Sequence, residues 1–334
     1  MKLFDEMQGI TKLVEAVLNG DRLALARLLT QVEQDTPAGL KALDMLFQHT
    51  GKAYLIGITG APGTGKSSLV NRLVYALRHP AGDVLHKRVA VIAVDPSSPF
   101  TGGALLGDRV RMRNLAGDTG VFIRSMASRG SLGGLARATA SSAQVLDAAG
   151  FEVILIETVG AGQVEVDIAR LADTILVVGT PGLGDEIQAI KAGILEIADI
   201  LAINKADQPG VEEAEQFLHM MVEMTSAQEA ADDETKRWIP PIVRTIALRG
   251  EGIQELLDAI QRHAVYLENS GQKQERARHR LEYDLINRVQ ERLLARWRGE
   301  AAGFAFQEMV ERIFHREISP YQAAEQLVEA TTRL

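Results

Sequence analysis

Cysteine is missing from the sequence altogether. Its absence excludes disulfide bonds, cysteine-ligated zinc, iron–sulfur clusters and thiol catalysis. The sequence also lacks any apolar run close to the roughly 18–20 residues that span a bilayer, and charged residues occupy Met1–Glu6, where a signal peptide needs an apolar core. We therefore expect a soluble protein of the cytoplasmic, bacterial type with no membrane partner. A cleaved organellar presequence would already be absent from this chain.

Positive charge is in deficit as well. The chain has 36 Lys and Arg against 44 Asp and Glu, and its net charge is −8. The basic residues are spread along the sequence, so we expect no nucleic-acid partner. The seven histidines show no metal-ligand spacing, and Trp238 and Trp297 are interpreted as packing residues.

Short β-branched runs separated by helical stretches begin at about residue 53 and indicate parallel βαβ units. Several runs are apolar without alternation, which is typical of strands covered on both faces. The expected strands are Tyr54–Thr59, Val89–Val94, Val121–Ile123, Val153–Ile156, Thr174–Val178, Ile200–Ile203 and Ile242–Ile246. We predict the α/β class, with a doubly wound and mostly parallel sheet.

Helical patterns flank this region on both sides. Residues 1–50 predict an N-terminal helical extension, with Gly20 and Asp21 as a helix break and N-cap and with Leu23, Leu25, Leu28 and Leu29 among its apolar positions. Residues 51–268 form the predicted α/β domain, and residues 269–334 a C-terminal helical arm. Within the arm, the charged stretch 272–278 predicts either the solvated side of a long helix or an arm that pairs with a second copy.

The most informative motif follows the first expected strand directly. It reads Gly60-Ala61-Pro62-Gly63-Thr64-Gly65-Lys66-Ser67-Ser68 and fits G-x-x-x-x-G-K-[ST] between a strand and a helix. Glycines allow successive backbone N–H groups to face an anion, and the helix adds its positive end. Lys66 would reach the β- and γ-phosphates of a nucleotide, and Ser67 would bind Mg²⁺. The alternative, a glycine-rich surface turn, accounts for neither the Lys-Ser pair nor its flanking elements.

A second motif, Asn204-Lys205-Ala206-Asp207, follows a later apolar strand. A carboxylate at Asp207 can accept hydrogen bonds from N1–H and the 2-amino group of guanine, whereas adenine would leave it unpaired. Sites built on such hydrogen bonds can favour the ligand that makes them over one that does not by a factor of roughly 10⁴–10⁵. Lys205 would lie along the base and Asn204 would tie its loop to the phosphate loop. The alternative interpretation of Asp207 is a helix N-cap.

Further polar residues follow the other expected strands, and in a doubly wound sheet ligands bind at this edge. Glu157 ends one strand and can hold Mg²⁺ through a water, and the N–H of Gly160 can meet the γ-phosphate. Ala161 stands where small GTPases of the Ras type have the glutamine that orients water. We therefore expect Gln163, Glu165 or a partner to supply that function, or hydrolysis to be slow.

These motifs together resemble the MeaB/ArgK family of GTPases. The residues that carry the resemblance are Glu157–Glu165, Gly60–Ser68, Asp95–Pro99 and Gly107–Met112. The resemblance covers essentially the whole chain and implies a P-loop G domain of the SIMIBI type. It further implies a chaperone of adenosylcobalamin-dependent acyl-CoA mutases, methylmalonyl-CoA mutase above all, which gates cofactor loading and protects or reactivates the mutase, and a homodimer formed through the C-terminal arm.

The resemblance also implies the site residues. GTP or GDP would be held by Gly60–Ser68, Asn204, Lys205 and Asp207 and closed by Ile246, Ala247 and Leu248. Ile246 stands where the family has a small hydroxyl residue, so only backbone contacts are expected there. Mg²⁺ would be held by Ser67, with Asp95, Asp108 and Glu157 around it, and catalysis would rest on Lys66, Glu157 and Asp108.

Other interpretations stay open at this point. Asp95 and Asp108 could be ordinary loop or helix-start carboxylates, and Arg109, Arg111 and Arg113 are read either as neutralising the γ-phosphate or as surface ion-pair partners. Thr180–Gly184 with Lys191 resembles a partner-sensing loop, or is a plain connection. As rival functions we consider an ATP-dependent protein phosphotransferase and a nickel- or zinc-insertion GTPase, although the latter usually carries Cys- or His-rich motifs. A nucleotide-locked scaffold without turnover is the third alternative.

Overall fold

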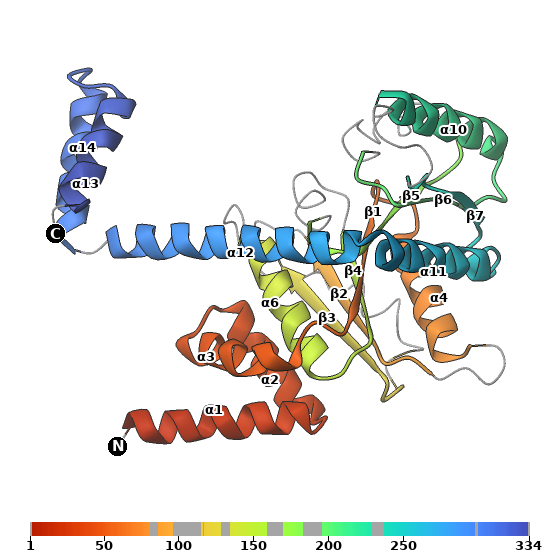
Figure 1. The fold of residues 1–334 in the computed structure, drawn as a ribbon, viewed down its shortest axis with the longest axis horizontal. Coiled ribbons are helices and arrows are strands. Elements are labelled where there is room, and N and C mark those ends of the chain that lie inside the picture. The colour runs from red at the N-terminus through yellow and green to blue at the C-terminus, as the bar shows by residue number, and fades with distance from the viewer. Residues whose placement is uncertain are drawn as a thin grey trace. The chain divides into compact units, whose positions relative to one another are not determined.

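The computed structural model describes residues 2–80, 86–95, 115, 117–127, 134–158, 170–182, 196–228, 237–297 and 300–332. It divides the chain into two compact units, residues 1–274 and 275–334. Both are drawn in Figure 1. No helix in the described ranges has the length and apolar character needed to cross a membrane.

A seven-stranded parallel sheet, in the order β3-β2-β4-β1-β5-β6-β7, forms the centre of the first unit. The strands are β1 (Tyr54–Thr59), β2 (Val89–Asp95), β3 (Val121–Ala127), β4 (Val153–Thr158), β5 (Thr174–Gly179), β6 (Ile200–Asn204) and β7 (Ile242–Thr245). This arrangement confirms the predicted fold class. β3 extends four residues beyond its predicted end at Ile123, because the less apolar segment Arg124–Ala127 continues to pair with β2.

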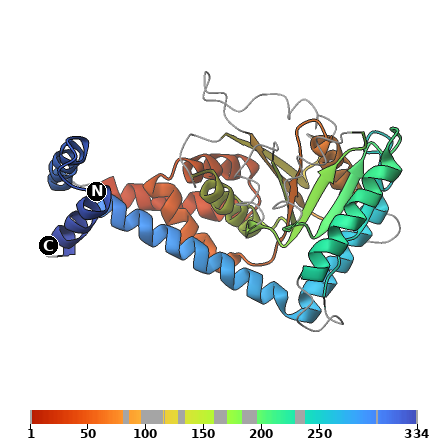
Figure 2. The ribbon, with the colours of Figure 1, turned by 90° about the horizontal axis from the view of Figure 1, so that it is seen from above.

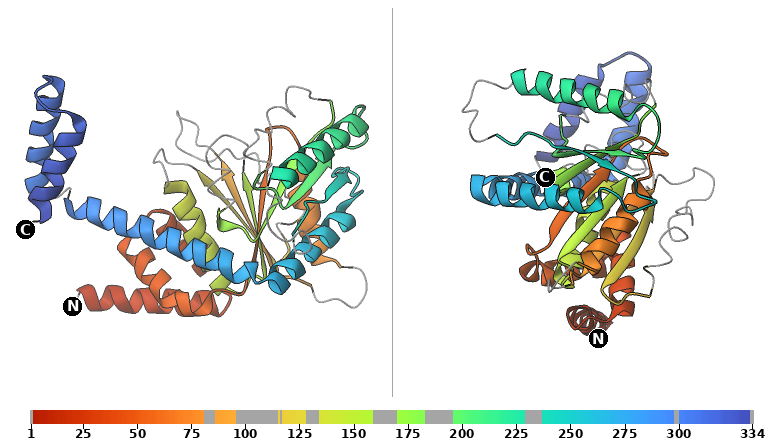
Figure 3. Two further views of the ribbon diagram at one scale, coloured as in Figure 1. Left: turned by 45° about the horizontal axis from the view of Figure 1, so that its top comes forward. Right: turned by 90° about the vertical axis from the view of Figure 1, so that its right-hand side faces the viewer.

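Helices cover both faces of the sheet, as the two orientations in Figure 3 show. On one face, α4 (Lys66–Arg78) and α11 (Ile253–Ser270) pack against side chains such as Ile56, Ile58 and Leu155. On the other, α6 (Gly134–Ala148) and α10 (Val211–Gln228) pack against alternate residues of the same strands. Every residue of β4 is buried. Burial on both faces explains why the strand sequences are apolar without alternation.

The N-terminal helices are α1 (Lys2–Leu18), α2 (Arg22–Glu33) and α3 (Pro37–Leu46), followed by a short 3-10 turn at Phe47–His49. Asp21 caps α2 by accepting hydrogen bonds from the N–H groups of Leu23 and Ala24, at 2.8 and 3.0 Å, which confirms the predicted break. The expectation that Leu23 lies on the apolar face is wrong. Its side chain is 59% exposed, because the helical repeat of 3.6 residues puts it off the buried stripe of α2.

These helices pack beside α6 at the β3 edge of the sheet (Figure 2). Arg22 donates to the carbonyl oxygens of Thr119 and Val121 at 2.8 and 2.7 Å. Arg124 of β3 makes a two-pronged ion pair with Glu33 of α2, with both N–O distances 2.6 Å. These contacts fix the N-terminal helices to the outer strand of the sheet.

The second unit is helical and comprises most of α12 (Gln272–Trp297) together with α13 (Glu300–Phe314) and α14 (Pro320–Thr332). α11 ends at Ser270, and its C-cap Gly271 adopts a left-handed conformation with φ 76°. α13 and α14 contact each other, and Arg312 donates to Gln326 at 3.5 Å. On α12, apolar side chains spaced four residues apart are exposed. They are Leu281, Leu285, Val289 and Leu293.

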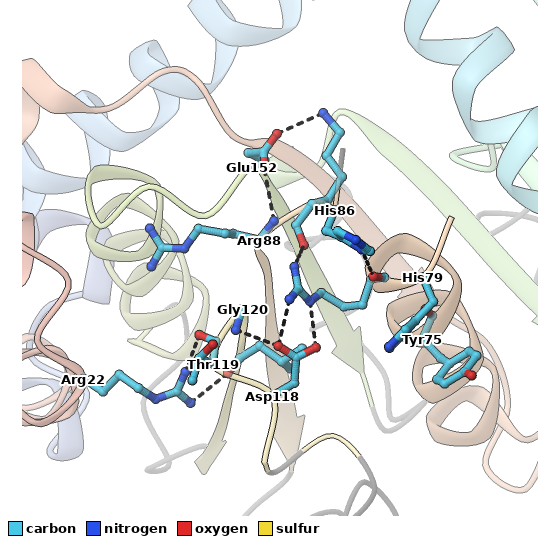
Figure 4. A network of polar contacts seen from close by, with 12 residues as sticks. Arg22, Tyr75, His79, His86, Arg88, Asp118, Thr119, Gly120 and Glu152 are labelled. Atoms are coloured by element: carbon cyan, nitrogen blue, oxygen red, sulfur yellow. Dashed lines mark hydrogen bonds and ion pairs between the residues drawn. The ribbon is translucent and has the colours of Figure 1, made fainter. Parts of the chain in front are cut away.

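A polar network ties α4 to the amino-terminal ends of the strands (Figure 4). The guanidinium of Arg78, the last residue of α4, donates to both carboxylate oxygens of Asp118 at 2.8 and 2.9 Å. The N–H of Gly120 donates to the same carboxylate at 2.7 Å. The hydrogen bonds from Arg78 lower the pKa of the Asp118 carboxyl below its ordinary value of 3.8. Burial would raise the pKa of Glu152, but hydrogen bonds from Arg88 and Lys87 outweigh it and lower that pKa too.

We predict that replacing Asp118 with alanine lowers the free energy of unfolding by about 2 kcal/mol at neutral pH, because it leaves the guanidinium of Arg78 without this partner. Because the pKa is lower in the folded state than in the unfolded chain, the stabilisation is complete above 3.8. The stabilisation is lost as the pH falls through the lower pKa that Asp118 has in the folded state. Urea unfolding from neutral pH to below 3.8 measures the difference in the free energy of unfolding between variant and wild type. This difference should become smaller in acid.

The control is Glu268→Ala, which removes the exposed ion pair with Lys273 and should change the free energy of unfolding by less than about 1 kcal/mol. Equal stability of wild type and Asp118→Ala at neutral pH would contradict the structural role of this network.

Candidate functional site

The candidate site lies at the carboxyl ends of the central strands. β1 is flanked by β4 and β5, and the loop that follows it leads directly into α4. A cleft of about 310 Å³ opens here. Its lining comprises Pro62, Gly63, Gly65, Lys66, Ser67, Ser68, Ala93, Val94, Glu157 and Thr158. Most of the predicted phosphate loop and the predicted acid Glu157 therefore face one space.

Two glycines of the loop are required by its geometry. Gly60 has φ 141°, and a Cβ atom there would lie 2.1 Å from the carbonyl oxygen of Val178 in β5. Gly65 has φ 88°, and a Cβ atom would lie 2.4 Å from the side-chain nitrogen of Asn204. Both conformations are in the region that favours glycine. The loop can pass this close to β5 and Asn204 only because these residues have no side chain.

Lys66 and Gly65 form the start of α4. Gly65 is the N-cap and Lys66 the first helical residue, so the positive end of the helix dipole points toward the cleft. The buried ammonium group of Lys66 donates to the carbonyl oxygens of Gly60 and Ala61, at 2.7 and 2.8 Å. Positive charge is therefore concentrated inside the curl of the loop, where an anion would bind.

Ser67 and Glu157 meet at the base of the cleft. The Ser67 hydroxyl donates to Oε1 of Glu157 at 2.6 Å, and the glutamate is only 5% exposed. A hydroxyl and a carboxylate are oxygen ligands of the kind that Mg²⁺ prefers, so this pair fits a magnesium ion. Across the described residues, no group of three or more His, Cys, Asp or Glu side chains is placed to hold a metal ion.

Asn204 connects the phosphate loop to a second loop. Its side chain is 2% exposed. The amide nitrogen donates to the carbonyl oxygen of Thr64 at 2.8 Å, which is the tie that the sequence predicts. The amide oxygen accepts from the N–H of Ala247 at 3.0 Å and from the hydroxyl of Thr245 at 3.3 Å. One buried amide thus fixes the distance between residues 64 and 247.

Lys205 and Asp207 follow at the end of β6. The ammonium of Lys205 donates to the carbonyl oxygen of Gly63 at 2.9 Å, so this loop contacts the phosphate loop twice. Lys205 has φ 59°, a conformation that is costly for a residue with a side chain and is retained by the surrounding contacts. Asp207 is exposed, and its carboxylate accepts from the guanidinium of Arg249 at 3.3 Å. α10 begins only at Val211, so Asp207 is not placed as its N-cap.

The predicted base loop is a tight turn. The N–H groups of Arg249 and Gly250 both donate to the carbonyl oxygen of Ile246 at 2.9 Å, and the N–H of Ile246 donates to the carbonyl oxygen of Glu251 at 3.0 Å. Ala247 is buried, whereas Leu248 at the tip is 80% exposed. One position before Ile246, the hydroxyl of Thr245 is buried and donates to the amide oxygen of Asn204 at 3.3 Å.

The structure therefore brings together the phosphate loop, Glu157, Asn204, Lys205, Asp207 and residues 246–248. Asp95 is the last residue of β2, but its side chain is not among those described. Several further residues to which the sequence analysis gave a role lie outside the described ranges. They are Asp108, Arg109, Arg111, Arg113, Gly160, Ala161, Gln163, Glu165 and Lys191.

The sequence interpretation missed two contributors, Thr245 and Arg72. Arg72 of α4 donates to the carbonyl oxygens of Ala247 and Leu248. Backbone acceptors 175 and 176 residues away leave no pattern in the sequence, so no motif could have indicated this contact. The hydroxyl of Thr245, just before Ile246, was the one available signal.

Comparisons with known proteins agree with this geometry. The family model described as "Methylmalonyl Co-A mutase-associated GTPase MeaB" matches residues 25–302. The chain is 45% identical over 322 residues to "Putative GTPase PYRAB02490" of Pyrococcus abyssi, covering 96% of each chain. It is 35% identical over 266 residues to "GTPase ArgK" of Escherichia coli, covering 78% of each.

A mitochondrial relative and a solved structure extend the comparison. "Methylmalonic aciduria type A homolog, mitochondrial" of Mus musculus is 30% identical over 340 residues, which covers 97% of this chain and 80% of that protein. The solved structure "Crystal structure of LAO/AO transport system kinase" superposes with a TM-score of 0.69 at 26% identity, covering 97% of both chains. The similarity thus extends over both the sheet and its helical extensions.

We predict that Asn204→Ala lowers the free energy of unfolding by about 2–3 kcal/mol, because it leaves buried hydrogen-bonding groups in both loops without their partner. Urea unfolding in the absence of nucleotide measures this effect. Asn269→Ala, at an exposed position near the end of α11, is the matched control and should change stability by less than about 0.5 kcal/mol. Similar values for the two variants would show that the amide bridge is not a stabilising contact.

Proposed function

The chain belongs to the MeaB family of methylmalonyl-CoA mutase-associated GTPases, and from this premise we propose that it is a Mg²⁺-dependent GTPase that serves a cobalamin enzyme. The observation that carries the proposal is the buried Asn204 amide, which fixes a phosphate-binding loop and a base-binding loop relative to each other. A nucleoside triphosphate needs both loops at a defined separation, because its phosphates and base are joined covalently.

The phosphates are bound by the loop Gly60–Ser68. Backbone N–H groups at the start of α4 and the ammonium of Lys66 supply positive charge where the β- and γ-phosphates lie. Ser67 and Glu157 would hold Mg²⁺, and the ion would supply positive charge to offset the charge that develops on the phosphate oxygens. Asp95 and Asp108 complete this proposal as further acidic groups around the ion, and Asp108 shares the catalytic role with Lys66 and Glu157.

The base is selected by Asp207. Its carboxylate can accept from both N1–H and the 2-amino group of guanine, whereas N1 of adenine is itself an acceptor. Lys205 would lie along the base in this proposal, and the contact of its ammonium with the carbonyl oxygen of Gly63 supports a position beside the phosphate loop. Backbone groups of Ile246, Ala247 and Leu248 close the base site. This arrangement supports GTP rather than ATP as the nucleotide, and it argues against a protein phosphotransferase.

Hydrolysis is slow in the isolated protein, in this proposal, because Ala161 cannot orient an attacking water. A partner, or Gln163 or Glu165 of this chain, supplies that group. The partner we propose is an adenosylcobalamin-dependent acyl-CoA mutase, most simply methylmalonyl-CoA mutase. The name of the family model, which describes a methylmalonyl-CoA mutase-associated GTPase, supports this choice. The nucleotide state would then gate cofactor loading and protect or reactivate the mutase.

The arm at residues 269–334 is proposed to form a homodimer. Support comes from the stripe of exposed side chains at Leu281, Leu285, Val289 and Leu293 on α12. An apolar stripe at helical spacing is the surface that a second helix covers. A monomeric mass for the full chain in light scattering would rule this out.

We predict that Asp207→Asn weakens the affinity for GDP by about 100-fold or more and increases the affinity for xanthosine diphosphate. Xanthine has a carbonyl where guanine has its 2-amino group, and an asparagine amide can donate to that carbonyl while accepting from N1–H. Competition against a fluorescent guanine nucleotide measures both changes. Asp258→Asn, at an exposed position of α11, should leave both affinities unchanged. Equal binding of GDP by wild type and Asp207→Asn would refute the assigned role of Asp207.

We further predict that GTP hydrolysis rises when a methylmalonyl-CoA mutase is added, by a factor between about 10 and 10⁵, the upper value being what partners achieve with P-loop GTPases. Phosphate release under single-turnover conditions measures the rate. Lys66→Ala should abolish both the basal and the stimulated activity, and a cobalamin-independent enzyme should give no stimulation. Fast turnover without any partner would count against the proposal.

A further inference from the structure

Arg72 makes an uncommon pair of contacts near the base loop. It lies on α4, six residues after Lys66, and therefore about 9 Å along the helix axis from that residue. Its Nε donates to the carbonyl oxygen of Ala247 at 2.9 Å, and its Nη2 donates to that of Leu248 at 2.6 Å. Two consecutive carbonyl groups of the base loop thus accept hydrogen bonds from one guanidinium on the phosphate-binding helix.

Both backbone polar groups of Ala247 are therefore hydrogen-bonded to side chains. Its N–H donates to Asn204, and its carbonyl accepts from Arg72. The turn itself is closed by the hydrogen bonds that Ile246 accepts. Hydrogen bonds from a charged guanidinium are stronger than those between neutral groups, and the fork of Arg fixes direction as well as distance. Asn204 ties the base loop to the start of α4, and Arg72 ties it to the body of the helix.

We propose that Arg72 is a positioning residue for the purine base. By fixing Ala247 and Leu248 against α4, it holds the base loop in register with the phosphates, so that guanine meets the backbone groups of the loop and Asp207 together. Removing the guanidinium leaves the phosphate loop unchanged but allows the base loop to move. Removing Arg72 should therefore weaken the binding of guanine nucleotides and leave the binding of adenine nucleotides unchanged. This inference rests on the proposed function, because it concerns the same nucleotide site.

The test uses Arg72→Met, which keeps an apolar stem and removes every donor, and Arg72→Lys, which keeps a charge but not the fork. Affinities for GDP and ADP are measured on the full chain by competition against a fluorescent guanine nucleotide. We expect Arg72→Met to weaken the affinity for GDP about tenfold and to leave the affinity for ADP unchanged. The ratio of the GDP affinity to the ADP affinity then falls about tenfold. Arg72→Lys should give an intermediate ratio and keeps the test informative if the methionine variant does not fold.

Arg78→Met is the matched control on the same helix. Arg78 clamps Asp118 at the opposite end of α4, so its loss should lower the melting temperature without changing the GDP-to-ADP ratio. A merely structural role of Arg72 would give the same pattern as this control, and an unchanged ratio in the Arg72 variants would overturn the proposal. Equal weakening of GDP and ADP would overturn it as well. A wild-type protein that binds GDP and ADP alike would instead contradict the proposed function itself.

Discussion

The nucleotide site depends on one buried side-chain amide. Asn204 donates to the loop after β1 and accepts from the turn after β7, two segments that lie 140 and 43 residues away from it in sequence. Because a buried amide without partners is costly, the surrounding structure keeps both contacts, and the two loops cannot move apart independently. The contact also explains why Gly65 has no side chain, since a Cβ atom would occupy the place of the Asn204 amide.

Helix α4 carries this constraint through the rest of the first unit. It begins at the phosphate loop with Lys66, holds the base loop through Arg72 and ends at Arg78, which is paired with Asp118 before β3. The N-terminal helices then cover β3 through Arg22 and the Arg124–Glu33 ion pair. Helix α4 therefore contacts the phosphate loop, the base loop and the segment that precedes β3. A nucleotide bound at one end of α4 adds to a framework that is already well connected.

Much of the fold and of the site could be predicted from the sequence. β-branched and apolar runs located the seven strands of the sheet, and in strands such as β4 burial on both faces leaves few polar positions. The phosphate loop, Asn204 and Asp207 were predicted from short motifs whose residues act through local geometry. The position of Leu23 was predicted wrongly, since spacing alone did not show which side of α2 packs against the neighbouring helices α1, α3 and α6. Arg72 could not be predicted, because its acceptors are carbonyl groups that every residue has.

Residue types at short spacing were readable from the amino-acid sequence. They include a glycine-rich loop that ends in Lys66 and Ser67, an acid at Asp207 for which we propose guanine recognition, and an absence of cysteine that removes whole classes of catalysis. The tertiary structure alone decided how these parts are joined. It placed Ser67 on Glu157, Lys205 on Gly63 and Arg72 on the base loop. These contacts join segments that follow different strands, and such segments become neighbours only when the parallel sheet has formed.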